Sequence, residues 1–441
     1  MTRPDVAVVG GGLAGTAAAL AAADAGATVM LLEKRPHLGG AAAAVFRRGR
    51  WQDHGQHVLL RCCTAYRTFI ERIGGGEHLY LQQRLEIPVV RPGVETQWIR
   101  RNSWPAPLHL GPSIARYAHL SLRERALVGP AALALRGLDR ADASLDRSSF
   151  GSWLTAHGQS RAAVDALWDL IALPTLNLHA PDVSLLAATR TFQMGLLHDA
   201  GAADIGWATV PLSRLHDDLA RKALASAGVE VRLRCGVDTV ERDAAGTMRL
   251  RVDDGADIEA KSVILAVPHH RLGTLLPPEG LELGERVASL GASPIVNIHL
   301  TFDRPAFPYP LAACLDTLVQ WVFDRSAAVG LPAGRYLVVS QSAAEDCARM
   351  PARTLIPRVL RDLKRLFPDA RAAQLLEGSV IRDTGATPRL APGSDALRAG
   401  SASPIPGIFV AGAWTDTGWP ATMESAVRSG SAAAAEAARD R

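Results

Sequence analysis

The chain is poor in cysteine, lysine and aromatic side chains, and each shortage excludes a class of protein. Its five cysteines are odd in number and lack the spacing of a metal site, which predicts reduced thiols in the cytoplasm and no metal centre. The neighbours Cys62 and Cys63 suit a redox pair or, more simply, two packed thiols. Only four of the 48 basic residues are lysines and the arginines are scattered, so the net charge of +4 does not indicate a nucleic-acid surface.

Long apolar runs are also missing. No stretch reaches the roughly 20 apolar residues that a bilayer-spanning helix needs. A strand pattern begins within the first ten residues, where a signal peptide would lie, so we expect a cytoplasmic protein that is soluble or peripheral to the membrane. What is plentiful is small and apolar: 48% hydrophobic residues over 441 positions predict a large core, in two interleaved domains.

The N-terminus carries the most specific motif. An apolar run at 6–9 leads into a turn with Gly10, Gly12 and Gly15, then into an Ala-rich helix and a second strand that ends in Glu33. Gly10 permits the tight turn, Gly12 lets the backbone approach a pyrophosphate, and Gly15 lets helix and strand pack closely. The helix N-terminus offers N–H groups to phosphates, and Glu33 is spaced to accept from a ribose hydroxyl. An ordinary glycine-rich turn would not be followed at these spacings by a helix, a second strand and an acidic residue. We therefore predict a dinucleotide site.

The sequence after Glu33 decides which dinucleotide is bound. Arg35 and the pair Gly39–Gly40 follow, a continuation that a site for NAD alone does not need. A buried strand is predicted at 407–412 and a closing helix at 422–438. Three further strand-like segments lie between the N-terminal motif and residue 407, at 228–233, 237–241 and 261–268. Taken in order, these segments resemble the flavin amine oxidase and phytoene desaturase superfamily across nearly the whole chain.

This resemblance implies FAD as the cofactor and an α/β fold, in which a Rossmann-like FAD-binding domain is interleaved with an α+β substrate domain. The FAD-binding domain is expected at 1–75, 206–291 and 376–441, and the substrate domain at 76–205 and 292–375. The segments at 228–233 and 237–241 look like the strand pair on the adenine side. The residues expected to hold FAD are Gly10, Gly12, Leu13, Ala14, Gly15, Glu33, Lys34, Arg35, Gly39, Gly40, Gly55, Gln56, Val237, Ala266, Gly412, Asp416, Thr422 and Met423.

Two segments narrow the resemblance. Residues 53–60 and 414–426 look most like the hydroxysqualene dehydroxylases of hopanoid biosynthesis, also called squalene-associated desaturases. That resemblance implies the conversion of hydroxysqualene, an apolar isoprenoid, to squalene by reduced FAD, with an electron donor that the sequence does not identify. A carotenoid desaturase is the runner-up. An amine oxidase and a non-catalytic flavin-binding lipid carrier are the remaining alternatives.

Release of an allylic hydroxyl needs a proton donor. In the resembling enzymes the segment around Gly55 runs past the flavin ring, and His54 and His57 flank this glycine. A histidine with a pKa near 6.5 suits a general acid at cellular pH, so His57 is the first candidate, followed by Asp53 and His54. Each also suits a structural role: the histidines as hydrogen-bond partners of backbone or ribose, and Asp53 as the partner of an arginine or histidine.

Three residues are expected near the substrate. The amine-oxidising branch typically carries a lysine on the strand beneath the flavin, and the alternating segment 294–302 has Asn297 there. Trp414 suits one of the two aromatic rings that flank an amine, but no second ring is evident, which weakens the amine oxidase alternative. Trp419 lies in the same closing motif.

The segment 104–128 is expected to contact membranes. It interleaves Trp104, Ile114, Tyr117, Leu120, Leu122, Leu127 and Val128 with arginines, as interfacial helices do. The simpler alternative is an amphipathic helix packed on its own domain. The resemblance to enzymes that take isoprenoids from the bilayer favours peripheral contact, at the inner face of the membrane.

Overall fold

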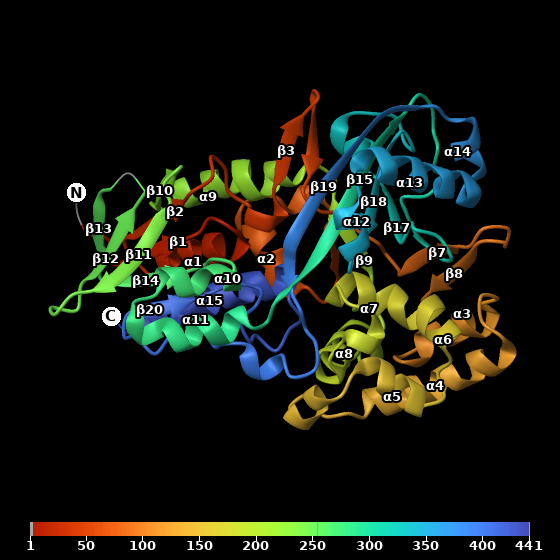
Figure 1. Cartoon of the computed structure of the whole chain (residues 1–441), viewed down its shortest axis with the longest axis horizontal. Coiled ribbons are helices and arrows are strands. Elements are labelled where there is room, and N and C mark those ends of the chain that lie inside the picture. Colours follow the sequence, from red (N-terminus) through yellow and green to blue (C-terminus); the bar gives the residue numbers. More distant parts are fainter. Residues whose placement is uncertain (1–2, 254, 441) are drawn as a thin grey trace.

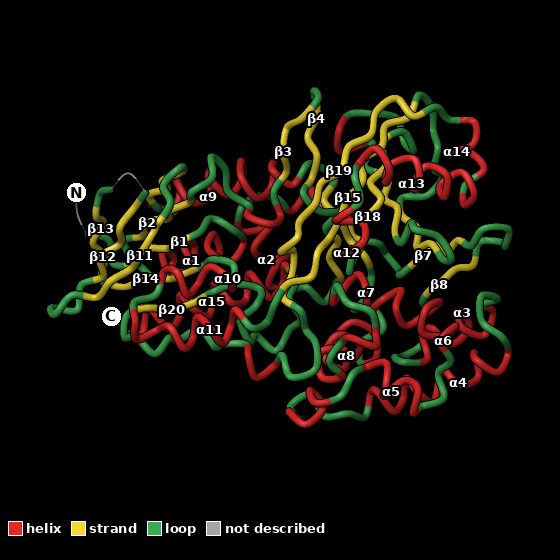
Figure 2. Tube along the Cα trace, in the orientation of Figure 1, coloured by secondary structure: helices red, strands yellow, loops and turns green. Residues whose placement is uncertain are grey.

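The computed structural model describes residues 3–253 and 255–440. It has two sheet-based parts side by side, with a group of short helices below the second (Figure 1). The strands in Figure 2 fall accordingly into one bundle beside the N-terminus and another across the opposite half. Long β-strands β15 and β19 run between the two halves.

A parallel five-stranded sheet forms the centre of the first part. Its strands, in spatial order, are β10 (Glu230–Leu233), β2 (Val29–Glu33), β1 (Val6–Val9), β14 (Ser262–Leu265) and β20 (Ile408–Val410). β1, β2, β14 and the edge strand β20 are buried at every position, as strands of a parallel sheet covered on both faces are. Two helices pack together beside this sheet, α1 (Leu13–Asp24) and α15 (Met423–Arg439). A Cβ at Gly430 of α15 would lie 2.1 Å from the Ala14 carbonyl oxygen, so these helices pack backbone to backbone.

A small antiparallel sheet lies beyond the parallel one. It consists of β11 (Val237–Arg242), β12 (Met248–Val252) and β13 (Asp257–Ala260), whose buried side chains join a core with α10 (His269–Leu275) and α11 (Leu281–Ala288). The expectation that 228–233 and 237–241 form a strand pair is wrong. β10 pairs with β2, and β11 pairs with β12, because the chain changes sheets after Leu233.

The second part is built on a seven-stranded sheet. Its spatial order is β19 (Leu375–Pro388), β15 (Ala292–Phe302), β18 (Tyr336–Gln341), β17 (Trp321–Asp324), β16 (Leu311–Cys314), β7 (Glu86–Val90) and β8 (Gln97–Arg100). Helix α13 (Ala352–Leu366) covers it, together with α12 (Glu345–Arg349) and α14 (Pro368–Ala372). The domain boundary predicted at residue 376 is wrong, because β19 pairs with β15 along its length and therefore belongs to this sheet up to Pro388.

The helical group buries part of the segment that was predicted to contact membranes. Its members are α3 (Gly111–Arg116), α4 (Leu122–Arg136), α5 (Phe150–Ala156), α6 (Arg161–Ala163), α7 (Asp169–Leu176) and α8 (Leu185–Phe192). Tyr117, Leu120 and Val128 are buried in the core of this group, so they face their own domain, as the simpler alternative held. Within the segment, Trp104, Leu108 and Leu122 remain exposed. Among the described residues, no helix combines the length and the hydropathy that crossing a membrane requires.

Short elements join the two parts. A hairpin of β3 (Ala44–Arg47) and β4 (Arg50–Asp53) projects from the molecule in Figure 1. A three-stranded sheet follows, in the order β5 (Val58–Leu60), β9 (Ile205–Ala208) and β6 (Leu79–Leu81). Helices α2 (Thr64–Arg72) and α9 (Ala220–Ser226) pack against the parallel-sheet part.

Candidate functional site

The glycine turn after β1 admits no side chain at two of its positions. Gly10 has φ +105°, and a Cβ there would lie 2.4 Å from the carbonyl oxygen of Ala266, at the end of β14. A Cβ on Gly15 would lie 1.8 Å from the Gly10 carbonyl oxygen. Since real Cβ atoms do not approach this closely, only glycine lets α1 start directly against β1 and β14.

Gly12 has a different reason to be glycine. It adopts an ordinary extended conformation, and a Cβ there would meet only the Gly40 Cα, at 3.8 Å. The protein therefore leaves room beside Gly12, between α1 and the loop with Gly39 and Gly40. Gly12 is also the N-cap of α1, and no side chain caps that helix. Open space beside an uncapped helix N-terminus fits the pyrophosphate of a dinucleotide.

The loop after β2 is positioned by Glu33. One carboxylate oxygen accepts from the Gly11 N–H at 2.6 Å and the other from the Arg35 N–H at 2.8 Å. The Arg35 guanidinium donates to the Gly40 carbonyl at 3.4 Å, while Lys34 is exposed. Glu33 thus lies at the carboxyl end of β2, next to the glycine turn, where its position fits a ribose-binding acid.

His216 supports the Gly39–Gly40 loop from behind and was not predicted from the sequence. Its Nδ1 lies 2.7 Å from the Ala42 carbonyl and its Nε2 lies 2.9 Å from the Tyr66 hydroxyl. Burial lowers the pKa of His216 to about 4, so the ring is neutral near pH 7. The neighbouring Asp217 accepts from the Leu38 N–H at 3.1 Å. These contacts join the loop to a segment far along the chain, which no local pattern indicated.

The C-terminal part completes this end of the site. Gly412 follows β20 and donates its N–H to the Ser429 hydroxyl at 2.9 Å. Thr422 is the N-cap of α15 and Met423 is its first residue, again with no side-chain cap, which leaves N–H groups for a flavin carbonyl. Glu424 is buried; it accepts from the N–H groups of Ala65 and Tyr66 at the start of α2 and pairs with Arg428 at 2.7 Å. The i,i+4 spacing of Glu424 and Arg428 is the one sequence signal for this pair.

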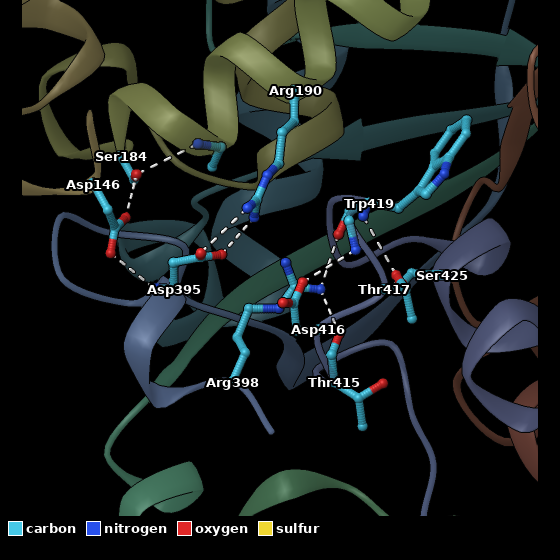
Figure 3. Close-up of polar contacts among 12 residues, drawn as sticks. Asp146, Ser184, Arg190, Asp395, Arg398, Thr415, Asp416, Thr417, Trp419 and Ser425 are labelled. Atoms are coloured by element: carbon cyan, nitrogen blue, oxygen red, sulfur yellow. Dashed lines mark hydrogen bonds and ion pairs between the residues drawn. The ribbon is translucent and has the colours of Figure 1, made fainter. Parts of the chain in front are cut away.

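Arg398 holds the loop between β20 and α15, and sequence reasoning also missed it (Figure 3). It is buried and donates to the carbonyls of Thr415 at 2.5 Å, Trp419 at 2.8 Å and Trp414 at 3.3 Å. No carboxylate of the described residues forms an ion pair with it, and burial lowers its pKa. Its charge is therefore satisfied by backbone dipoles, which fixes the loop that carries Asp416.

A second cluster ties the segment that carries Arg398 to the helical group. Arg190 of α8 pairs with Asp395 at 2.5 Å. Asp146 accepts from the Asp395 N–H at 2.9 Å and from the Ser184 hydroxyl at 2.5 Å. Figure 3 shows these residues beside Arg398. The loop between β20 and α15 is thus connected to the helical group through the segment with Asp395 and Arg398.

The segment 53–57 is held by the second sheet. Asp53 accepts from Arg325 at 3.1 Å and from the Leu212 N–H at 2.9 Å, and both charged side chains are at most 10% exposed. Asn297 is completely buried in β15; its amide donates to the His54 carbonyl at 3.1 Å and accepts from the Gln56 N–H at 3.3 Å. Asp53 thus has the structural ion-pair partner foreseen as one alternative. The Asn297 amide is hydrogen-bonded to the backbone on both sides of Gly55, so both of its polar atoms already have partners within the protein.

His57 packs its ring against Gly55. Its Nδ1 lies 2.9 Å from the Gly55 carbonyl oxygen, which only accepts, so Nδ1 carries the proton and Nε2 is the free nitrogen. Burial lowers the pKa of His57, with the Gly55 carbonyl and the Asp53 carboxylate acting in the opposite sense. Burial, with Arg35 nearby, also lowers the pKa of His54. Both histidines are therefore mostly neutral near pH 7, which the assumption of an ordinary pKa did not anticipate.

The remaining predicted residues lie in different surroundings. Trp414 is 3% exposed in the core shared by β14 and β20, and its Nε1 donates to the Val267 carbonyl at 2.9 Å, so its position does not support a substrate contact. Trp419 is half-buried, with the Arg428 guanidinium 4.9 Å from its ring centre. Asp416 is exposed and accepts from the Gly418 N–H at 3.1 Å. Val237 is the first residue of β11, and the buried Gln56 Oε1 has no hydrogen-bond partner among the described residues.

These features agree with what comparisons with known proteins find. A family model described as flavin containing amine oxidoreductase matches residues 13–438. The zeta-carotene desaturase of Synechocystis is 26% identical, over 97% of this chain and 96% of its own. The zeta-carotene desaturase of Zea mays is 24% identical, over 96% and 82%. The 15-cis-phytoene desaturase of Solanum lycopersicum is 25% identical, over 97% and 77%.

Solved structures share the fold. A redesigned putrescine oxidase superposes with a TM-score of 0.73 at 19% identity, covering 98% of both chains. Cyclohexylamine oxidase from Brevibacterium oxydans gives 0.71 at 18% identity, covering 99% of both. The predicted Rossmann-like α/β fold is confirmed. The uncapped helix ends and the space beside Gly12 fit FAD, the predicted cofactor of this flavin-containing family.

Proposed function

Because the chain belongs to the flavin-containing amine oxidoreductase family, we propose that it is an FAD-dependent enzyme that reduces hydroxysqualene to squalene. The observation that carries the substrate class is the set of relatives that span nearly the whole chain, which are named for carotenoids, long apolar isoprenoids. The choice of hydroxysqualene within that class rests on segments 53–60 and 414–426.

Asn297 argues against oxidation of a polar amine. The position where the resembling amine oxidases carry a lysine holds an asparagine, and both polar atoms of its amide are bonded to backbone groups of His54 and Gln56. Unlike lysine, an asparagine at this position has no positive charge to present to a bound molecule. The two solved amine oxidases support the fold only, so the amine oxidase alternative gains nothing from them.

In the proposed reaction the protein binds the alcohol, excludes water and supplies a proton to the departing hydroxyl. When bound and reduced, FAD supplies the two electrons and the hydrogen that replace the hydroxyl group. The hydrogen bonding of His57 supports a role in proton transfer, because its Nδ1–H is held by the Gly55 carbonyl and no hydrogen bond among the described residues involves Nε2. With a lowered pKa, protonated His57 is a stronger acid than ordinary histidine, although fewer molecules carry the proton at pH 7.

The test compares products under two flavin states. Photoreduced protein is incubated anaerobically with hydroxysqualene, and oxidised protein with phytoene. We expect squalene from the first incubation and no desaturated product from the second. Desaturated phytoene without squalene would move the assignment to a carotenoid desaturase, the second candidate, which the relatives' names favour. If the protein retained FAD but converted neither lipid, the remaining alternative would be a non-catalytic flavin-binding lipid carrier.

We also propose that this apolar substrate is collected at the α3–α4 end of the protein, from the inner face of the membrane. Trp104, Leu108 and Leu122 are 54%, 57% and 79% exposed there, and Arg116 and Arg123 are exposed beside them. Apolar side chains among arginines suit an interface with anionic lipid. Leu108→Ser combined with Leu122→Ser should reduce co-sedimentation with phosphatidylglycerol vesicles and leave flavin absorbance unchanged. The matched control is Leu281→Ser, an exposed leucine on α11; equal sedimentation of both variants and parent would contradict this surface.

A further inference from the structure

The β3–β4 hairpin is a rigid projection. Its two-residue turn has positive φ at both positions, 53° at Arg48 and 77° at Gly49, as the tight hairpin turns that match strand twist require. One face is anchored to the second sheet: Arg50 donates to Thr301 at 2.6 Å, and Ser379 donates to Gln52 at 2.8 Å. The tip is therefore held in a fixed orientation.

The opposite face of the hairpin is aromatic and exposed. Phe46 and Trp51 are cross-strand partners, 58% and 41% exposed, with ring centres 5.4 Å apart in an edge-on arrangement. Side chains alternate along each strand, so these rings point away from the anchored face that carries Gln52. Trp51 also lines a small cavity with Asp53, His299 and Arg325, so its inner part is packed while its outer part is exposed beside Phe46. Partly exposed aromatic pairs are typical of surfaces that bind a partner.

The same tip is positively charged. Arg47 and Arg48 are exposed, and Arg50 is partly exposed. Glu377 of β19 pairs with Arg48 and Arg50, each at 3.4 Å, whereas no ion pair of the described residues holds Arg47. One carboxylate against three guanidinium groups leaves a net positive charge at the tip. Because side chains alternate, Arg47 and Arg50 lie on the face opposite the aromatic pair, so a partner that covers the end of the hairpin would meet both.

The hairpin is also continuous with two segments of the flavin site. β3 begins shortly after Gly40 of the pyrophosphate loop, and β4 ends at Asp53, where the segment with Gly55 and His57 begins. A partner bound at the tip would therefore lie against the strands that connect these two segments.

We propose that the tip of the β3–β4 hairpin docks an acidic one-electron carrier protein of the iron–sulfur or flavin class, which reduces FAD. The inference rests on the proposed reductive function, because a reductive reaction needs a supply of electrons. Two reduced carriers each give one electron, and one proton from solvent completes the two-electron reduction of FAD. Transient electron-transfer complexes use small interfaces that combine charge complementarity with an apolar centre, as this tip offers.

A protein partner suits this surface better than a second membrane contact. In Figure 1 the hairpin lies at the top of the molecule and α3 and α4 lie at the lower right, with strands of the seven-stranded sheet between them. A protein resting on a bilayer through α3 and α4 presents the hairpin to the cytoplasm. The rigid turn also favours docking of a shaped partner over insertion into fluid lipid.

The test uses a reduced plant-type ferredoxin as the probe, with the FAD-loaded full chain. Binding of oxidised ferredoxin is measured calorimetrically across a salt titration, and flavin reduction by reduced ferredoxin by stopped flow. Phe46→Ser combined with Arg47→Glu should weaken binding and slow reduction about tenfold or more at low salt. The control Leu281→Ser combined with Arg286→Glu replaces an exposed apolar residue and an exposed arginine of α11 with the same two residue types, and it should stay within about twofold of the parent. Reduction by dithionite should be equal in all three proteins.

Several outcomes would overturn the proposal. They are equal binding and reduction in the hairpin variant and the parent, and failure of the parent to bind either ferredoxin or an acidic flavodoxin. Loss of phosphatidylglycerol vesicle binding in the hairpin variant, with ferredoxin reduction retained, would assign the tip to lipid. A concentration-dependent dimer that the variant abolishes would assign it to a second copy of the chain. None of these readouts uses hydroxysqualene, so turnover by photoreduced protein judges the proposed function separately.

Discussion

The nucleotide end of the site and the segment 53–57 are built in opposite ways. At the nucleotide end, Gly10, Gly12 and Gly15 act through their missing side chains, and their partners lie in the same motif or in one neighbouring strand. Segment 53–57 is held by side chains far away in sequence, Asn297 at a separation of 243 residues and Arg325 at 272. The nucleotide end can therefore be predicted from the spacing of glycines in the sequence. The surroundings of segment 53–57 form only when both sheets have folded.

The largest expected effect distinguishes two glycines of the same turn. Gly15→Ala should prevent FAD retention and also destabilise the fold, because the new Cβ would overlap the Gly10 carbonyl oxygen. Gly12→Ala should abolish FAD retention with an unchanged melting temperature of the flavin-free protein, because its Cβ has room in the protein and fills only the ligand's space. Flavin absorbance after gel filtration and thermal unfolding measure the two effects. Normal FAD retention by Gly12→Ala would place the pyrophosphate elsewhere.

The second largest effect is expected from breaking the ion pair that anchors segment 53–57 to the second sheet. Arg325→Met leaves Asp53 buried without its partner, and we expect the free energy of unfolding to fall by about 3–5 kcal/mol. Adding Asp53→Asn removes the uncompensated charge and should restore part of the loss. Urea unfolding of the single and double variants measures both. A double variant no more stable than Arg325→Met would contradict the ion-pair explanation.

His57 tests whether the anchored segment performs chemistry. His57→Gln keeps a hydrogen-bonding side chain but supplies no proton, so single-turnover reoxidation of the reduced flavin by hydroxysqualene should slow about 100-fold, just under 3 kcal/mol. Since the pKa of His57 lies below 6.5, the parental rate should rise as pH falls toward that pKa, and the variant should lose this rise. Flavin content serves as the control. A variant that reacts at near the parental rate would move the proton donor to His54, Asp53 or water.

The smallest expected effect concerns His216, behind the pyrophosphate loop. Its pKa is about 4 in the folded protein, against 6.5 for an ordinary exposed histidine, so the unfolded state takes up the proton first as pH falls. This group should therefore remove about 2 kcal/mol of stability between pH 7 and pH 5. The His216→Gln variant should be less stable than the parent at pH 7, but its free energy of unfolding, measured with urea, should change less between pH 7 and pH 5. An equal pH slope in variant and parent would contradict the buried neutral ring.

Local patterns predicted the fold well where the structure depends on them. The glycine turn, β20 and α15 lie where the sequence indicated, since strand and helix signals are local. The boundary at residue 376 failed because β19 looks like any strand until its pairing with β15 is known. Leu120 shows the same limit: composition indicated an interfacial helix, but whether a leucine faces lipid or its own core depends on the neighbouring helices.

The candidate site divides along the same line. Arg398, Arg325 and His216 were missed because each is defined by backbone carbonyls or side chains that only tertiary packing brings together. No spacing rule separates such a buried arginine from the many exposed ones in an arginine-rich chain.

The packing of α1 against α15 has a consequence for synthesis. β1, the glycine turn and α1 are made well before β20 and α15, which complete the same site. A nascent or truncated chain that stops before residue 408 exposes the small-residue face of α1 and lacks the loop that Arg398 holds. We therefore expect flavin to be retained only once β20 and α15 have been made, and a chain truncated before residue 408 should purify without flavin colour.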